Sequence, residues 1–171
     1  MSASTIGELL QAQDFTIATA ESCTSGLLCH LFGAVPGASA WLLGGWVTYT
    51  NELKVSQLGV EQNLIKEHGA VSAQVAAAMA QGAAKRSGAD VALSITGIAG
   101  PTGGSEAKPV GTIFIGCKVQ GYVEVREFRF SGERNAVQEH AALAALHMAQ
   151  LQLKGEHVAS LANQHGEVNA F

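Results

Sequence analysis

The sequence predicts an α/β fold in which a single domain forms a three-layer α/β/α sandwich around a mixed β-sheet. Segments typical of strands alternate with segments typical of helices over the first two thirds of the chain, and a hairpin-like segment and one long helix follow. This order predicts parallel strands with helical crossovers, to which an antiparallel hairpin is added. The chain has 171 residues, of which 47% are hydrophobic and 14% are charged, and this is enough to enclose one core.

The N-terminal segment predicts a helix, a strand and a second helix. Ile6, Leu9 and Leu10 lie at helical spacing and indicate a short amphipathic helix. Residues 15–20, FTIATA, are apolar and β-branched enough for a buried strand. Residues 25–33, SGLLCHLFG, then indicate a helix that is closed by its final glycine.

The middle of the chain predicts two more strands and two more helices. Residues 44–50, GGWVTYT, indicate a second strand, and NELKVSQLG after them indicates a short helix with Asn51 as its N-cap. Ser72 is expected to cap an alanine-rich helix over residues 73–88, whose small side chains let a helix lie close to a sheet. Residues 90–97, DVALSITG, indicate a third strand that leads into a glycine-rich loop.

A β-hairpin is predicted by two strand-like segments that lie next to each other. Residues 111–119 and 122–130 are joined by Gln120 and Gly121, a pair typical of a tight hairpin turn. Apolar and charged residues alternate along the second segment, and a slip of register is expected at Arg126–Glu127.

The last part of the chain defines the expected domain boundary. A long helix is expected over residues 134–153, so that residues 1–153 form the domain. The remaining residues, 154–171, are polar and are expected to form a loosely ordered tail. No internal repeat and no linker that could separate two domains is found in the sequence.

Composition excludes several classes of protein. The net charge is -4, and Lys and Arg are scattered, which argues against nucleic-acid binding. No apolar run reaches the roughly 20 residues of a membrane span, and the N-terminus lacks the features of a signal peptide. An odd number of cysteines without a CxxC pair predicts free thiols in a reducing cytoplasm, and the histidines show no metal-site spacing. The cysteines are Cys23, Cys29 and Cys117.

The stretch AESCTSG, residues 20–26, places nucleophilic side chains between a predicted strand and a predicted helix. The amides of a helix's first turn can stabilise an alkoxide or the oxyanion of a tetrahedral intermediate, so Ser22 is a candidate nucleophile. The alternative is that Ser22 or Thr24 only caps the helix. Cys23 is a rival nucleophile, but a thiolate normally needs a histidine partner and none flanks the stretch, so a buried thiol is expected.

Lys54 is the candidate base. With Asn51 as N-cap it falls at the third helical position, where the helix dipole disfavours a positive charge, and partial burial lowers its pKa further. A neutral lysine can then accept the serine proton, as in Ser–Lys catalysis. Tyr49 could relay that proton or orient the lysine. The alternatives are a surface lysine on a short helix, with Glu21 and Asn51 as turn formers.

The glycine-rich loop over residues 96–111 is a candidate cradle for a phosphate, because its amides can approach a ligand closely. It is not a Walker A loop, since no Gly-Lys-Ser/Thr follows at the required spacing. A plain structural loop is the alternative, and Arg134 either reaches a ligand phosphate or pairs with Glu133. The candidate loop residues are Thr96, Gly97, Gly100, Thr102, Gly103, Gly104, Ser105, Lys108 and Gly111.

Five stretches, taken in order, resemble the CinA C-terminal domain family. They are AESCTSG, GGWVTYTNELK, GAVS, SITGIAGPTGGSEAKPVGT and FSGER. The likeness runs from about Ile6 to Leu153. Enzymatically characterised members of this family are nicotinamide-nucleotide amidases. The resemblance therefore implies a self-associating α/β/α enzyme that hydrolyses nicotinamide mononucleotide to nicotinate mononucleotide and ammonia in NAD recycling. No metal or cofactor is expected, because the activated hydroxyl supplies the nucleophile.

The resemblance also implies roles for individual residues. The family nucleophile falls on Ser22, and the motif with the catalytic tyrosine and lysine falls on Tyr49 and Lys54. Thr24 matches the family hydroxyl and is expected in the same hydrogen-bond network, with helix-start amides near it holding the oxyanion. The expected substrate-binding residues, which include Lys108 or Arg134 for the phosphate, are Glu21, Cys23, Ser25, Gly26, Thr48, Asn51, Thr96, Gly97, Ala99, Gly100, Gly104, Ser105, Lys108 and Arg134.

The sequence departs from the family pattern at Ser25, where the family motif has glycine. A serine side chain there could crowd the substrate or add a donor. The chain also lacks the nucleotide-processing N-terminal domain of longer members and is expected to be a stand-alone form. Two other functions are compatible with the sequence: a catalytically silent binding or regulatory paralogue, and a Ser–Lys hydrolase of a different amide or ester.

Overall fold

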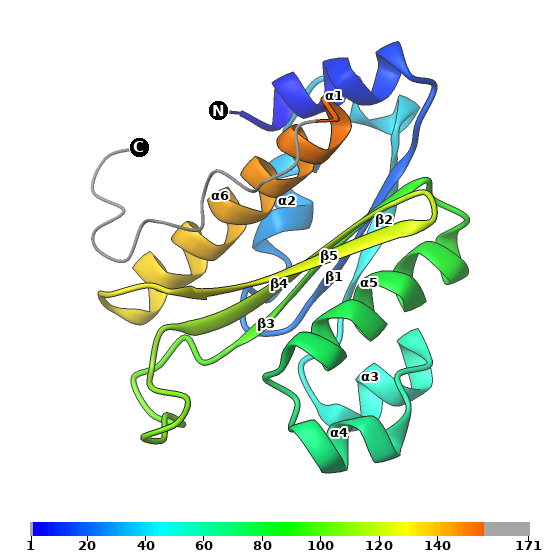
Figure 1. Cartoon of the computed structure of the whole chain (residues 1–171). Helices are drawn as coiled ribbons and strands as arrows, with labels where there is room; N and C mark the ends of the chain where they lie inside the picture. The colour runs from blue at the N-terminus through cyan, green and yellow to red at the C-terminus, as the bar shows by residue number, and fades with distance from the viewer. Residues whose placement is uncertain (1, 156–171) are drawn as a thin grey trace.

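The computed structural model describes residues 2–155 and contains a mixed five-stranded sheet between two layers of helices (Figure 1). The strand order is β2-β1-β3-β4-β5. The first three strands are parallel, and the last two are antiparallel, as the sequence predicts. The strands are β1 (Ile17–Glu21), β2 (Leu42–Val47), β3 (Val91–Gly97), β4 (Thr112–Val119) and β5 (Tyr122–Arg129).

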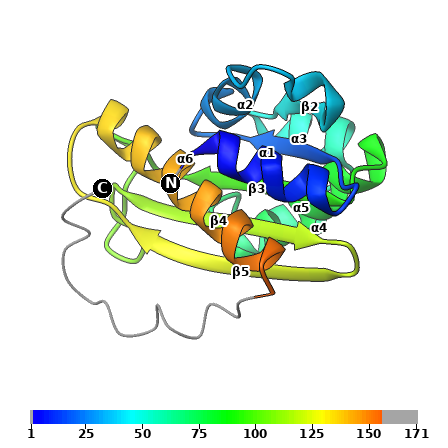
Figure 2. The same ribbon diagram turned by 90° about the horizontal axis from the view of Figure 1, so that it is seen from above.

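Three helices cover each face of the sheet in the described part of the chain (Figures 1 and 2). One face carries α1 (Ala3–Ala12), α2 (Leu27–Gly33) and α6 (Arg134–Leu153), and a 3-10 turn, η1 (Ala38–Ala40), precedes β2. The other face carries α3 (Asn51–Leu58), α4 (Gln62–His68) and α5 (Ala73–Ser87). The α/β/α sandwich is thus confirmed, while α4 is an addition that the sequence did not predict. No helix among residues 2–155 is both long and apolar enough to cross a membrane.

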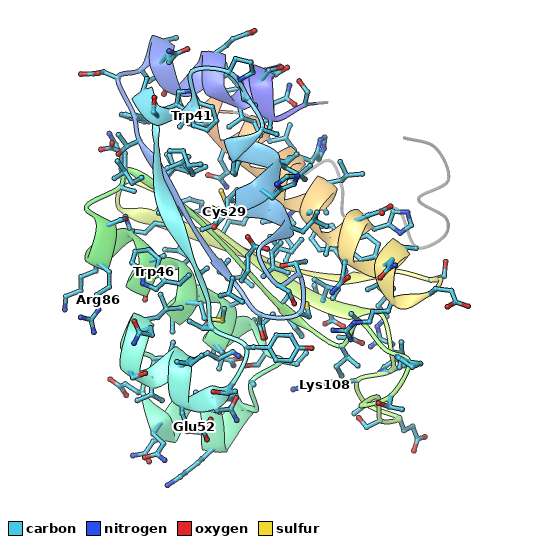
Figure 3. All side chains as sticks on the ribbon, turned by 180° about the vertical axis from the view of Figure 1, so that it is seen from behind. Cys29, Trp41, Trp46, Glu52, Arg86 and Lys108 are labelled. Carbon is cyan, nitrogen blue, oxygen red and sulfur yellow. The ribbon has the colours of Figure 1, made fainter. Side chains whose placement is uncertain are left out.

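The core is divided by the sheet into two clusters. On the side of α1 and α2, Phe32 packs edge-on against Trp41 with ring centroids 5.7 Å apart. Trp41 lies beneath α1 (Figure 3), where a Cβ atom at Gly7 would lie 2.8 Å from its ring. On the side of α5, the packing depends on small residues. A Cβ atom at Gly82 would lie 2.1 Å from the Leu58 carbonyl oxygen, so only glycine lets α5 and α3 approach this closely.

The hairpin is confirmed, but the predicted slip of register is wrong. The β4–β5 pairing runs without interruption from Thr112 opposite Arg129 to Val119 opposite Tyr122. Because side chains alternate between the two faces of a strand, Val123 and Val125 lie on one face of β5 and Phe128 lies on the other. Phe128 stacks on Phe130, with ring centroids 5.5 Å apart, against the α6 side of the core. The change of apolar pattern reflects burial on both faces rather than a bulge.

The parallel strands bring three chain segments to one edge of the sheet. Glu21 at the end of β1 is opposite Val47 at the end of β2 and Ile95 near the end of β3. Ser22, Thr48 and Ile98 are therefore the first residues of three loops at the carboxyl ends of parallel strands, where ligand sites of α/β sheets form. The predicted tail is residues 154–171, and from residue 156 onward it lies outside the described residues.

Candidate active site

A pocket of about 260 Å³ lies at this edge of the sheet. Its lining comes from the end of β3, from the loops that follow the three parallel strands, from α3, from the segment before α5 and from the first residue of α6. The predicted residues that line it are Ser22, Cys23, Tyr49, Asn51, Lys54, Thr96, Gly97, Ala99, Gly100 and Arg134. The predicted residues that do not line it are Glu21, Thr24, Ser25, Gly26, Thr48, Gly104, Ser105 and Lys108.

Five further residues line the pocket; two of them, Thr102 and Gly103, belong to the predicted glycine-rich cradle, and the other three are not predicted as site residues. The five are Ala70, Val71, Ile98, Thr102 and Gly103. The signal for the first two was present in GAVS, and the others lie in the glycine-rich loop. The segment before α5 is held at the site by the Ala70 carbonyl, which accepts a hydrogen bond from Thr96 at the end of β3.

Ser22 and Lys54 meet at the floor of the pocket. The Ser22 amide donates to the Ile95 carbonyl (2.9 Å), which fixes the residue at the tip of β1. Lys54 Nζ lies 3.1 Å from Ser22 Oγ, although the two residues are 32 positions apart in the chain. The Lys54 side chain is only 1% exposed. The predicted pairing of nucleophile and base is therefore present in the geometry, and the reading of Lys54 as a surface lysine is wrong.

The surroundings of the Lys54 amine favour a base that faces Ser22. Its other two neighbours are the carbonyl oxygens of Thr48 (2.8 Å) and Tyr49 (3.4 Å), which can only accept hydrogen bonds. A neutral amine has two N–H donors and one lone pair. With both donors on carbonyls, the lone pair is left for the hydroxyl proton of Ser22, the one neighbour that can donate.

Burial favours the neutral form of Lys54. Removal of the ammonium from water lowers the pKa of Lys54, and this outweighs the opposite effects of Cys23 and Glu52. Burial also raises the pKa of the Cys23 thiol to about 12, so this thiol carries no charge near neutral pH. Cys23 is thus a poor nucleophile, as the sequence predicts.

The start of α3 differs from the prediction by one residue. Thr50 rather than Asn51 is the N-cap, and its Oγ1 accepts a hydrogen bond from the Leu53 amide (3.3 Å). Lys54 is consequently the fourth helical residue and not the third. Asn51 is exposed in the first turn and lines the pocket. The low pKa of Lys54 is due mainly to burial, since the dipole effect is confined to the first turn.

Tyr49 and Arg134 close one side of the pocket together. The Tyr49 side chain is 51% exposed, and its hydroxyl accepts a hydrogen bond from Arg134 Nη2 (2.8 Å). Arg134 Nη1 donates to the Gly100 carbonyl (2.8 Å). Tyr49 contacts Lys54 only through its main-chain carbonyl. The geometry therefore does not support Tyr49 as a proton relay. Of the two alternatives for Arg134, pairing with Glu133 is replaced by these contacts.

The amides at the start of α2 are already occupied. The fully buried carboxyl group of Glu21 accepts hydrogen bonds from the amides of Gly26 (3.0 Å), Leu28 (3.1 Å) and Cys29 (2.8 Å). Glu21 thus binds the protein's own main chain and not a substrate. The prediction that helix-start amides hold an oxyanion is corrected for the same reason.

The Thr24 hydroxyl does not join the predicted network, and the Thr48 hydroxyl, predicted to bind substrate, does not line the pocket. Both are buried, and neither has a hydrogen-bond partner among the described residues. Thr48 contributes its main-chain carbonyl, which accepts from Lys54. The amides of Cys23 and Thr24 also have no acceptor within the described part of the chain, so they are the free donors closest in sequence to Ser22.

Ser25 does not crowd the pocket, because its side chain is exposed and lies outside the lining. Its φ angle of 54° is in the left-handed region, and Gly26 after it has φ 99°. Glycine adopts this conformation more easily than any other residue. The family glycine at this position is therefore explained by the backbone of the turn.

Ser25→Gly is expected to raise the free energy of unfolding by about 0.5–1 kcal/mol, because glycine removes the steric cost of a left-handed residue. Thermal unfolding of the purified variant measures this gain. Ser25→Ala is the matched control, since it removes the same hydroxyl but keeps Cβ, and it should give no gain. Equal stability of the glycine and alanine variants would contradict the explanation.

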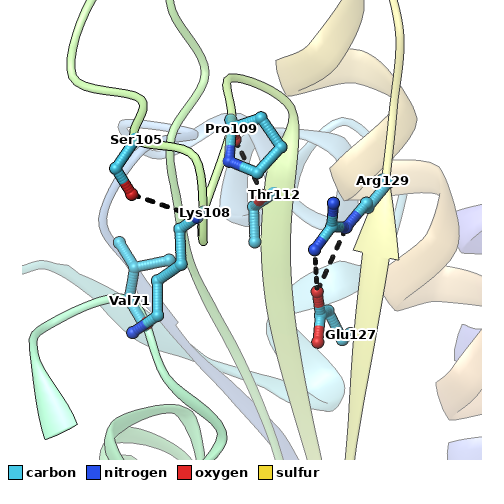
Figure 4. A network of polar contacts seen from close by, with 7 residues as sticks. All are labelled: Val71, Ser105, Lys108, Pro109, Thr112, Glu127 and Arg129. Atoms are coloured by element: carbon cyan, nitrogen blue, oxygen red, sulfur yellow. Dashed lines mark hydrogen bonds and ion pairs between the residues drawn. The ribbon is translucent and has the colours of Figure 1, made fainter.

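Lys108 links the glycine-rich loop to the segment before α5 (Figure 4) and does not line the pocket. Its Nζ donates to the carbonyls of His68 (3.1 Å) and Val71 (2.6 Å), and its amide donates to Ser105 Oγ (3.1 Å). The predicted phosphate role of Lys108 is therefore not supported, and Gly104 and Ser105 belong to the same structural part of the loop. Thr96 lines the pocket, and its hydroxyl donates to the Ala70 carbonyl (2.8 Å).

The charge of the pocket is positive although the chain is acidic. Arg134 supplies this charge, because burial favours the neutral form of Lys54, and none of the lining residues is Asp or Glu. A guanidinium has five N–H donors, and Arg134 uses two of them on Gly100 and Tyr49. The others remain for an anionic ligand.

Comparison with known proteins places this chain in a family. The model for the CinA C-terminal domain matches residues 1–153. A putative competence-damage inducible protein of Caldicellulosiruptor saccharolyticus is 52% identical over 139 residues, which make up 81% of this chain and 34% of that protein. A CinA-like protein of Citrifermentans bemidjiense is 50% identical over 138 residues, or 81% of this chain and 33% of that protein. The chain thus spans about a third of the length of these relatives.

Solved structures agree with the sequence comparison. The crystal structure of a CinA superfamily protein from Klebsiella pneumoniae superposes with a TM-score of 0.87 at 32% identity, covering 90% of this chain and 96% of that one. The competence/damage inducible protein CihA from Agrobacterium tumefaciens gives a TM-score of 0.85 at 39% identity, covering 89% and 93%.

Proposed function

This chain belongs to the CinA C-terminal domain family, and from that premise we propose that it is an amidohydrolase that converts nicotinamide mononucleotide and water to nicotinate mononucleotide and ammonia. The observation that carries the proposal is the buried Lys54 amine, which lies 3.1 Å from Ser22 Oγ and has two carbonyl acceptors as its other neighbours. In the neutral amine, hydrogen bonds to these carbonyls leave the lone pair for the Ser22 hydroxyl. An unaided serine hydroxyl is a weak nucleophile, and an adjacent neutral base activates it.

The first half of the reaction forms an acyl-enzyme. Lys54 Nζ accepts the Ser22 hydroxyl proton while Oγ attacks the carboxamide carbon of the substrate. The tetrahedral intermediate then expels ammonia, which takes its proton from the Lys54 ammonium and leaves a nicotinoyl ester on Ser22. In the second half, Lys54 deprotonates a water molecule that attacks this ester, so that nicotinate mononucleotide leaves and the serine is restored.

The amides of Cys23 and Thr24 are the proposed oxyanion donors. They lie next to Ser22 in the chain and have no acceptor among residues 2–155, whereas the amides at the start of α2 are used by Glu21. Amide donors stabilise an oxyanion effectively when folding has already fixed their orientation, because they need not reorganise during the reaction.

Arg134 is the proposed anchor for the substrate phosphate. It lines the pocket, and the contacts with Gly100 and Tyr49 hold its guanidinium at the rim while other N–H groups remain free. The amides of Ala99 and Gly100, which also line the pocket and have no acceptor in the described chain, can add donors. Charge-assisted bonds of this kind are stronger than neutral ones.

Ammonia release from purified protein with nicotinamide mononucleotide tests the proposal. Release that depends on Ser22 supports it, and nicotinamide riboside, which lacks the phosphate, should be the poorer substrate. No release from this nucleotide, with turnover of another amide or ester, would favour a Ser–Lys hydrolase of different specificity. No turnover of any substrate would favour a binding or regulatory paralogue. Self-association and a cytoplasmic location remain predictions, and sedimentation of the purified protein tests the first.

A further inference from the structure

Glu21 is a buried acidic residue directly before the nucleophile, and the reaction scheme gives it no role. We propose that Glu21 is a positioning residue: its carboxyl group fixes the turn after β1 so that the Cys23 and Thr24 amides face the oxyanion formed at Ser22. The inference deepens the proposed function and rests on it.

The carboxyl group of Glu21 replaces a missing cap on α2. The N-cap of α2 is Gly26, which has no side chain to bind the free amides. Glu21 supplies both oxygens instead: one accepts from Gly26 and Leu28, and the other accepts from Cys29. The side chain is 0% exposed, so water does not compete for these bonds.

These bonds close the segment that carries the oxyanion donors. Glu21 and Cys29 are the two ends of a nine-residue segment, and the carboxyl group joins them directly. Between them, the Ser25 amide donates to the Ser22 carbonyl (3.1 Å) and the Leu27 amide donates to the Thr24 carbonyl (3.1 Å). Two consecutive left-handed residues, Ser25 and Gly26, make this turn an unfavourable one to adopt without support.

The main chain of Ser22 itself is held by the neighbouring strands. The Ser22 amide donates to the Ile95 carbonyl, and the Glu21 carbonyl accepts from the Thr48 amide (2.8 Å). Side chains of successive strand residues point to opposite faces, so Glu21 reaches α2 on one face while Ser22 reaches Lys54 on the other. Loss of the Glu21 carboxyl group is therefore expected to move the amides that follow Ser22 rather than the Ser22–Lys54 pair.

The peptide between Cys23 and Thr24 is also held by a contact from α6. Gln138 Nε2, one turn into α6 from Arg134, donates to the Cys23 carbonyl (2.6 Å). In a trans peptide the carbonyl and the following N–H point in opposite directions, so this bond directs the Thr24 amide away from Gln138. Glu21 and Gln138 thus hold the turn at two points, Glu21 through three hydrogen bonds and Gln138 through one.

Glu21→Gln tests the proposal with little change in shape. The glutamine oxygen can replace one carboxyl oxygen, but its NH2 group cannot accept from an amide. We expect kcat for ammonia release to fall about 10- to 100-fold while KM stays within about threefold, because the donors act on the transition state. The midpoint of the pH profile should not change, since Lys54 keeps its surroundings. Glu21→Ala, which loses all three bonds, should lower kcat further.

Asp90→Asn is the matched control. The Asp90 carboxyl group also accepts from a main-chain amide, that of Thr16 (2.9 Å), but at the opposite end of β1. Both variants should lower the unfolding temperature, and only the Glu21 variants should lower kcat. A folded Glu21→Gln protein with kcat within twofold of wild type would overturn the proposal. If it does not fold, Glu21→Asp takes its place, and failure of both to fold would also overturn a role specific to the site.

The rate at which a fluorophosphonate labels Ser22 separates this proposal from the proposed substrate. Labelling uses the same nucleophile and oxyanion donors but no nucleotide. If the wild-type protein is labelled but releases no ammonia, and Glu21→Gln slows labelling at least about tenfold, the result would contradict the proposed substrate and leave the positioning role of Glu21 intact. Labelling at equal rates in wild type and Glu21→Gln would contradict the positioning role alone.

Discussion

Lys54→Met is expected to lower kcat/KM for ammonia release by about 10³-fold or more while the protein stays folded. Methionine keeps the length and the apolar contacts of the lysine stem, so the buried site is preserved in shape. It removes the base that takes the Ser22 proton across 3.1 Å. General-base catalysis contributes about 10²–10⁴-fold, and removal of a group that acts as a unit with the nucleophile costs at least as much.

Lys54→Arg tests whether Lys54 acts as a base or only as a positive charge. A guanidinium stays protonated at any pH the protein tolerates and cannot accept the serine proton. We expect the arginine variant to be as inactive as Lys54→Met. Lys66→Met, a change at an exposed lysine of α4, is the control and should leave activity unchanged. Recovery of activity in Lys54→Arg would show that the lysine acts through its charge.

Ser22→Ala is expected to have an equally large effect on kcat with little effect on binding. The alanine variant cannot form the acyl-enzyme, so only direct attack of water on the bound amide remains, and kcat should fall about 10³-fold or more. The nucleotide should still bind, because the groups proposed to hold it come from Arg134 and the glycine-rich loop. Isothermal titration with nicotinamide mononucleotide measures this binding.

Ser56→Ala is the control for Ser22→Ala, because Ser56 is exposed on α3 and lies outside the pocket. Its kcat should equal that of wild type. Turnover by Ser22→Ala above about a tenth of the wild-type rate would contradict a serine nucleophile and would direct attention to attack by an activated water.

Most of the fold follows from local sequence patterns. The order of strands and helices, the Ser72 cap and the Gln120–Gly121 hairpin are all present as predicted. These features depend on residues that are close in sequence. The helix α4 was not predicted, because its seven residues carry no side-chain cap and bury only Ile65. The slip predicted in β5 is absent from the pairing. The apolar residues of this strand shift from one face to the other, and in the sequence alone this shift has the same pattern as a bulge.

The candidate site was less predictable, because its chemistry depends on long-range packing. Ser22 and Lys54 were found from their positions at a strand end and a helix start, and the fold then buries the lysine. Three residues have roles in the structure that differ from the predicted ones, and the reason is the same for each: the polar group of the side chain binds a partner within the protein. Lys108 binds carbonyls before α5, the Tyr49 hydroxyl binds Arg134, and the Glu21 carboxyl group binds α2. Nothing in the adjacent sequence indicates these partners.

The pH dependence of kcat/KM for ammonia release tests most directly whether the neutral amine of Lys54 activates Ser22. Below the pKa of Lys54 the amine is protonated and cannot act as a base, so activity should rise with pH through a single ionisation. Because burial lowers that pKa, the midpoint should lie clearly below the ordinary lysine value of about 10.4. A profile that shows no ionisation below this value, or one that Lys54→Met leaves in place, would contradict the mechanism.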